Sequence, residues 1–151
     1  MAGELDFLSQ LRIDISKIVR LQRAYFQRNR LPLPPSLASI LATIDSFGPS
    51  TPTRLAALEG VRLPPISRAI AALEGQGLVR RETDPSDGRQ IMIHLTPIGR
   101  DSLDEIRDRV AEWMEVRFSG LDENDKAAIR RASSAIHRSM LQPNPSARKG
   151  F

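Results

Sequence analysis

Apolar side chains recur every three or four positions along much of the chain, which is the spacing of amphipathic helices. The first such stretch covers residues 5–28 and forms a single stripe, made of Leu8, Leu11, Ile15, Ile18, Gln22 and Tyr25. A proline-rich break at residues 31–35 ends this helix. A second helix is predicted over residues 36–47, with one apolar face made of Leu37, Ile40, Leu41 and Ile44.

Two shorter helices follow, joined by a tight turn. Thr51 is a suitable N-cap and Pro52 fits the first helical position, where a missing N–H costs nothing. The first of these helices is predicted over residues 53–59 and ends at Gly60, which favours a left-handed conformation. The second is predicted over residues 63–76, buries Ile66, Ile70 and Leu73, and ends at Gly77.

A β-hairpin is predicted next, with strands over residues 78–82 and 90–95. In the second strand Ile91, Ile93 and Leu95 alternate with polar positions, so His94 is expected on the exposed face. The loop between the strands, residues 83–89, is rich in turn-forming residues.

Two more helices complete the pattern. Thr96-Pro97 is a cap followed by a proline, and a helix is predicted from there to the break at Ser119-Gly120. Asp122 and Asp125 resemble a capping pair for a last helix, which carries Ile129, Ile136 and Met140. The tail at residues 142–151 is expected to be disordered.

Composition narrows the classes of function. The 151 residues contain no cysteine and two histidines, which excludes thiol chemistry and leaves few groups for catalysis or metal binding. No cofactor, metal site or membrane span is expected, and no secretion signal is seen, so we expect a cytoplasmic protein that is not an enzyme. The net charge of +4 comes from the first two thirds of the chain, and all but three of the 22 basic residues are arginine. This charge makes nucleic acid a plausible partner, although arginine-rich composition also follows from a GC-rich genome.

The order of helices and hairpin is typical of a winged helix-turn-helix, a mainly α fold with a small β-hairpin wing (α+β). The helix over residues 63–76 is then the recognition helix, with Pro65, Ser67 and Arg68 near base edges. Thr51, Thr53 and Arg54 begin the preceding helix, where phosphate contacts are favoured. Arg81 is a further phosphate candidate.

The hairpin loop supplies the second candidate contact with DNA. Arg89 lies in a loop that can enter a narrow minor groove, and Asp87 is placed to hold its guanidinium. Taken alone, residues 84–89 are more typical of a solvated turn than of a DNA contact. Their position directly after a helix-turn-helix favours the DNA interpretation.

Several spaced motifs resemble the MarR family of transcription regulators. They are GLVRR at residues 77–81, DPSDGR at 84–89 and LTPIG at 95–99, with LAAL at 55–58 and ISRAIAALE at 66–74 upstream. The resemblance implies a homodimer on a pseudo-palindromic operator, usually a repressor, in many relatives released by a small aromatic or phenolic ligand. It also implies that Arg89 enters the minor groove with Asp87 as its partner. The implied domain spans residues 1–141, with dimerisation helices at 5–30 and 97–141 and the winged lobe at 34–96.

The chain departs from the family pattern at the start of the recognition helix. Arg62 stands where a serine cap is common, and Pro64-Pro65 fills the first turn, so backbone N–H donors are missing there. Phosphate contacts through backbone amides are therefore not expected in this turn.

Two alternatives remain open. The apolar stripes of the first and last long helices are compatible with an ordinary core, although helices at both ends of a small chain favour a bundle between two subunits. The fold also serves as a non-catalytic protein-interaction module, and fold alone does not decide between these functions.

Overall fold

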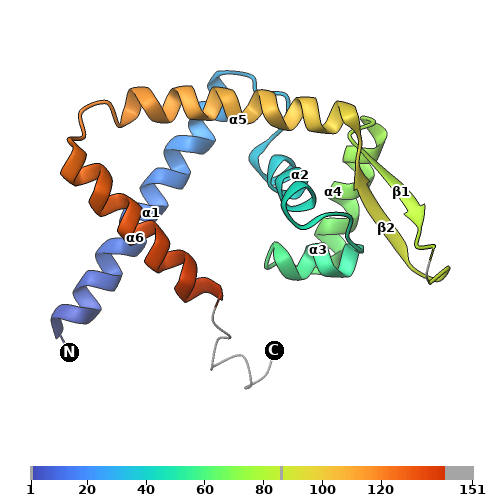
Figure 1. The fold of residues 1–151 in the computed structure, drawn as a ribbon, viewed down its shortest axis with the longest axis horizontal. Coiled ribbons are helices and arrows are strands. Elements are labelled where there is room, and N and C mark those ends of the chain that lie inside the picture. The colour runs from blue at the N-terminus through green and yellow to red at the C-terminus, as the bar shows by residue number, and fades with distance from the viewer. Residues whose placement is uncertain (1, 86, 142–151) are drawn as a thin grey trace. The chain divides into compact units, whose positions relative to one another are not determined.

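The structure, a computed structural model, describes residues 2–85 and 87–141 of the chain (Figure 1). The expected disordered tail at 142–151 lies outside the described residues. Within them the elements are α1 (Ala2–Arg28), α2 (Pro35–Phe47), α3 (Pro52–Leu58), α4 (Leu63–Gly75), β1 (Val79–Thr83), β2 (Ile91–Leu95), α5 (Pro97–Arg117) and α6 (Glu123–Leu141). The expected mainly α fold with a hairpin wing is confirmed. Its contacts group the chain into two units, residues 1–110 and 111–151, and each is described by itself.

The winged lobe has one continuous hydrophobic core, shared by α2, α3, α4 and the hairpin. Its most deeply buried side chains are Leu41, Leu55, Ile70, Leu73 and Ile93, each at 0% exposure. The sequence predicts burial of Ile66, Ile70 and Leu73 on α4, and all three are buried. Packing against this core fixes the orientation of α4, which leaves its opposite face to solvent.

The helix ends follow the predicted local chemistry. Thr51 Oγ1 accepts a 3.2 Å hydrogen bond from the Arg54 amide at the start of α3. Thr96 Oγ1 accepts a 3.0 Å hydrogen bond from the Gly99 amide at the start of α5. Asp122 Oδ1 accepts a 2.8 Å hydrogen bond from the Asp125 amide at the start of α6. Gly60, with φ of 65°, has the left-handed conformation that the sequence predicts.

The two strands form an antiparallel hairpin whose register runs from Val79 opposite Leu95 to Thr83 opposite Ile91. The predicted alternation in β2 is only partly right. Ile93 is fully buried, but Ile91 is 40% exposed because it lies near the free end of the hairpin. His94 is not simply exposed either. Its Nε2 atom lies 3.2 Å from Glu82 Oε2, and the side chain is half-buried.

Within unit 1, α5 contacts both α1 and the winged lobe. The Tyr25 hydroxyl donates to the Arg109 carbonyl over 2.9 Å, and Arg109 Nη2 donates to the Asn29 carbonyl over 2.7 Å. At the other end of α5, Gly99 packs directly on Leu78, the residue before β1. A Cβ atom built on Gly99 would lie 2.0 Å from the Leu78 carbonyl oxygen, so this contact requires glycine.

Apolar side chains remain exposed on the long helices. On α1 they include Leu8 at 54%, Ile15 at 43% and Ile18 at 47%. In unit 2, Ile129 and Ile136 of α6 are 49% and 36% exposed. Among the residues that the structure describes, no helix combines the length and the apolar character needed to cross a membrane.

Candidate nucleic-acid interface

The start of α3 presents the first group of predicted DNA contacts. Thr51 uses its hydroxyl oxygen to cap the helix, as described above, and the hydroxyl proton remains available to a phosphate. Thr53 and the side chain of Arg54 are exposed. Leu55 and Ala56 are buried directly behind them, which fixes the direction in which these polar residues point.

Helix α4 presents the second group. Pro65, Ser67 and Arg68 are all exposed. Arg68 lies opposite the buried residues of the helix, and Pro65 and Ser67 lie to either side of it. Arg62 is in the N-cap position with extended backbone, and its side chain makes no capping hydrogen bond. The expected absence of a serine-type cap and of amide donors in the first turn is therefore a real feature of this helix.

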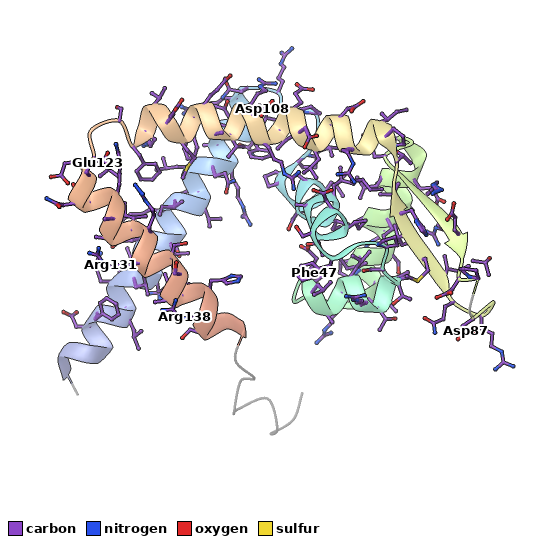
Figure 2. The ribbon with its side chains drawn as sticks, viewed as in Figure 1. Phe47, Asp87, Asp108, Glu123, Arg131 and Arg138 are labelled. Carbon is purple, nitrogen blue, oxygen red and sulfur yellow. The ribbon has the colours of Figure 1, made fainter. Side chains whose placement is uncertain are left out.

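The hairpin loop presents the third group, and Figure 2 shows Asp87 at its tip. The Asp87 carboxylate accepts two hydrogen bonds, one of 3.1 Å from the backbone amide of Arg89 and one of 2.9 Å from Gln90 Nε2. It thus holds the backbone of Arg89, whereas the sequence predicted that it would hold the guanidinium. The Arg89 side chain is exposed and makes no ion pair with the described residues.

Ser50 connects the second strand to the start of α3. It is fully buried and exchanges two backbone hydrogen bonds with Ile93, of 3.3 Å and 3.0 Å. Its hydroxyl donates to the Gly48 carbonyl over 3.1 Å. Beside this connection lies a shallow depression of about 370 Å³ lined by Thr51, Pro52, Thr53, Gln90 and Ile91. Sequence reasoning missed Ser50, since a serine in a proline-containing turn gives no signal of burial.

Charge pairing divides the six arginines of residues 34–96 into two classes. Arg80 pairs with Glu82, and Arg81 Nε lies 2.9 Å from Glu74 Oε2. The other four make no ion pair with any described residue, namely Arg54, Arg62, Arg68 and Arg89. They lie on α3, at the start of α4, on α4 and in the hairpin loop. Three of the four were predicted from the sequence as DNA contacts.

The carboxylates of the lobe are, in contrast, occupied. Glu74 and Glu82 hold Arg81 and Arg80, and Asp87 holds the loop backbone. The Glu59 carboxylate accepts a 2.7 Å hydrogen bond from the Ser39 hydroxyl and a second hydrogen bond from the Thr43 hydroxyl. The donors to Asp87 and Glu59 are neutral, so these two carboxylates keep their negative charge. The four arginines without an ion pair are the cationic groups of the lobe that are available to a polyanion.

An ion-pair cluster joins the lobe to α5 and was not found from the sequence. Asp45 of α2 lies 2.5 Å from Arg100 Nη1 and 2.8 Å from Arg107 Nη2, both on α5. The Asp45 side chain is 14% exposed. The hydrogen bonds from Arg107 and Arg100 hold the pKa of the Asp45 carboxyl below its usual value, against the opposing effect of burial.

A larger cavity of about 710 Å³ lies where the end of α1, the start of α2 and α4 meet. Its apolar wall includes Phe26 of α1, Ile40 of α2 and Ala69 of α4. Arg23 and Glu59 are its charged lining residues. The volume is in the range of small-molecule sites. Because Pro65 and Ala69 line it, the cavity is in direct contact with the recognition helix.

Known proteins resemble this chain over nearly its whole length. The chain is 34% identical over 134 residues to an uncharacterized HTH-type transcriptional regulator of Mycobacterium leprae, which covers 87% of this chain and 94% of the relative. An HTH-type transcriptional regulator of Mycobacterium tuberculosis matches over the same shares, also at 34% identity.

Solved structures share the fold. The transcriptional regulator BldR from Sulfolobus solfataricus superposes with a TM-score of 0.72 at 28% identity, over 89% of this chain and 97% of that one. A MarR family protein from Bacillus stearothermophilus gives a TM-score of 0.81 at 16% identity, over 94% and 99% of the two chains, and supports the fold alone.

Residues 33–91, which include α2, α3, α4 and most of the hairpin, match the MarR family. This is the segment that holds the nine predicted contact residues. The chain belongs to the MarR family, and it is a DNA-binding transcription regulator with a winged-helix fold and not an enzyme.

Proposed function

We propose that the protein is a homodimeric repressor that binds a pseudo-palindromic operator through its winged lobes. The observation that carries this proposal is the division of the lobe's arginines, because the four without an ion pair lie on the elements that meet DNA in this fold. We expect the protein in the cytoplasm, where it would have access to the operator DNA.

Each lobe makes three kinds of contact in this proposal. Thr51, Thr53 and Arg54 bind phosphates at the start of α3, and Ser67 and Arg68 of α4 meet base edges in the major groove, beside Pro65. Arg89 enters the adjacent minor groove, on a loop backbone that Asp87 holds in place. Arg81 contributes a weaker phosphate contact, because Glu74 already neutralises much of its charge.

The exposed apolar side chains of α1 and α6 support the dimer. Leu8, Ile15 and Ile18 form part of the stripe predicted on α1, and the described residues of one chain leave them open to water. A second copy that covered them would remove apolar area from solvent, which favours association. Two recognition helices in such a dimer meet half-sites about 34–36 Å apart.

The 710 Å³ cavity supports the proposed release by a small aromatic or phenolic ligand. An aromatic ring would pack on Phe26 and Ile40, a carboxylate would reach Arg23, and a hydroxyl would donate to Glu59. Since Ala69 of α4 lines the same cavity, a ligand that fits better when α4 is displaced would weaken DNA binding.

The test of DNA binding is selection from a library of random-sequence duplexes, followed by titration of the selected duplex and a scrambled one. The proposal predicts a pseudo-palindromic motif and a preference of about 10³-fold or more at physiological salt. Equal binding of both duplexes that disappears with added salt would contradict it, because that pattern is purely electrostatic. No binding even at low salt would favour the protein-interaction module.

The test of release uses a hydroxybenzoate as the probe, added to the preformed complex with the selected duplex. We expect it to dissociate the parent complex. The variant Ala69→Met, which fills the cavity from α4, should bind DNA and resist the probe. Equal sensitivity of the two proteins would contradict the assignment of the cavity.

A further inference from the structure

We infer that α4 recognises thymine methyl groups next to a guanine that Arg68 reads. This inference rests on the proposed DNA binding and specifies the base composition of the half-site. The structural basis is the surface that α4 leaves exposed, on which prolines and alanines surround Arg68.

Helical geometry assigns the outward positions of α4. Ile66, Ile70 and Leu73 are buried and define the inward direction. At 100° per residue, Pro64, Arg68 and Ala71 then lie on the opposite side. All three are exposed, and so are the residues that flank them, Pro65, Ser67 and Ala72.

Few groups on this surface can form hydrogen bonds to bases. Pro64 and Pro65 have no N–H, and Ala71 and Ala72 have no polar side-chain atoms. Glu74, the remaining charged residue of α4 besides Arg68, is paired with Arg81. Ser67 and Arg68 are therefore the side chains of α4 that are available for hydrogen bonding in the groove.

Only one base has an apolar group in the major groove. Thymine carries a methyl group at C5, whereas guanine, adenine and cytosine present acceptors and amino groups there. Apolar side chains placed over guanine, adenine or cytosine edges would remove water from polar groups without replacing their hydrogen bonds, which is unfavourable. The apolar positions around Arg68 thus favour thymines on either side of the guanine that a guanidinium prefers.

The experiment replaces thymidine by deoxyuridine, which differs only in the missing methyl group. In the selected duplex, each thymidine of a half-site is replaced together with its symmetry mate, and the Kd is measured by fluorescence anisotropy. Burial of one methyl corresponds to about a four-fold change in Kd, so we expect about 16-fold weaker binding for the sensitive pair. Replacement outside the half-sites should change the Kd by less than two-fold.

A variant of α4 tests whether the preference for thymidine comes from direct contact between α4 and the methyl group or from a change in DNA flexibility. Ala71→Ser places a hydroxyl on the outward face, and it should reduce the preference for thymidine over deoxyuridine. Ala57→Ser, at an exposed alanine of α3, is the matched control and should keep the preference. If Ala71→Ser keeps the full preference, the methyl groups act through DNA flexibility and the inference is wrong.

The outcomes distinguish this inference from the proposed function. A parent protein that prefers its selected duplex strongly, but binds every deoxyuridine version within two-fold of the original, overturns the inference and leaves the regulator intact. A protein that shows no preference for any duplex overturns both.

Discussion

Ser50 and Ile93 exchange backbone hydrogen bonds of 3.3 Å and 3.0 Å, although 43 positions separate them in the chain. Each of the two residues is fully buried. Thr51, the cap of α3, follows Ser50 directly, so this bridge fixes the start of α3 relative to the wing. The segment that begins with Thr51 is thus hydrogen-bonded directly to β2, the strand that follows the loop with Arg89.

This bridge predicts a pattern of amide hydrogen exchange. The amides of Ser50 and Ile93 should exchange slowly, because both are hydrogen-bonded and buried. The amide of Gly88, at the exposed tip of the wing, should exchange much faster. Mass spectrometry or NMR of the free protein measures this directly. Fast exchange of Ile93 together with Gly88 would show that the wing is not held by the α3 segment.

The contact of Gly99 with Leu78 predicts that substitution of this glycine lowers the free energy of unfolding. Gly99→Ala would place a methyl group 2.0 Å from the Leu78 carbonyl oxygen, so α5 must shift, at a cost of about 1–3 kcal/mol. Gly75→Ala is the matched control, since a Cβ there meets nothing within 4 Å. It should be neutral or stabilising by about 0.5–1 kcal/mol. Thermal unfolding of both variants is the measurement, and equal melting temperatures would contradict the predicted close approach.

The cluster around Asp45 predicts a stability difference that depends on pH. Its pKa is lowered in the folded protein, so its contribution is present above the unfolded pKa, near 3.8, and is lost as the pH falls through the folded value. Asp45→Asn should therefore destabilise the protein at pH 7, by no more than about 1 kcal/mol, and have little effect at pH 2 to 3.

Asp104→Asn is the control for that measurement. Asp104 lies 3.2 Å from Arg107 but is 56% exposed and holds only one arginine, so its removal should have a smaller effect at every pH. Urea unfolding at pH 7 and pH 3 compares the two variants. A loss for Asp45→Asn that is the same at both pH values would contradict the assigned ion pairs.

The exposed stripe of α1 predicts a change of oligomeric state. Ile18→Asp places a charge within this stripe, where a partner would cover it, and should convert a dimer of twice 16.8 kDa into a monomer. Ser16→Asp, on α1 but outside the predicted stripe, should leave the dimer unchanged. Sedimentation velocity measures both. A parent protein that sediments at 16.8 kDa at micromolar concentration would contradict the proposed dimer.

Local rules predicted most of the fold because they act within a few residues. The bounds of α2, α3 and α4 differ from the expected ones by one residue, since Thr51, Gly60 and the prolines determine helix ends locally. The resemblance of several spaced motifs to the MarR family located the segment predicted to bind DNA. The pattern could not show how Ile91 and His94 are buried, because that depends on the length of the hairpin that lies beyond the core.

Contacts between distant residues could not be predicted in the same way. Nothing in the segments around Asp45, Arg100 and Arg107 marks them as partners, and only the packing of α5 on α2 brings them together. The same holds for Glu74 and Arg81, whose ion pair changes which arginines are free to bind DNA. The role of Asp87 differs from the prediction because its carboxylate is occupied by the backbone of its own loop.

The most direct test of the central claim compares the salt dependence of DNA binding for Arg89→Ala, Arg68→Ala and Arg28→Ala. Arg28, at the end of α1, gives the same change of charge outside the lobe. For a homodimer that contacts DNA with both lobes, each lobe variant should weaken binding, and Arg28→Ala should match the parent. If Arg89 also neutralises a phosphate as it enters the groove, its loss should make the slope of log K against log salt shallower by about 2. Folded lobe variants that keep the parent's affinity and slope would contradict the account.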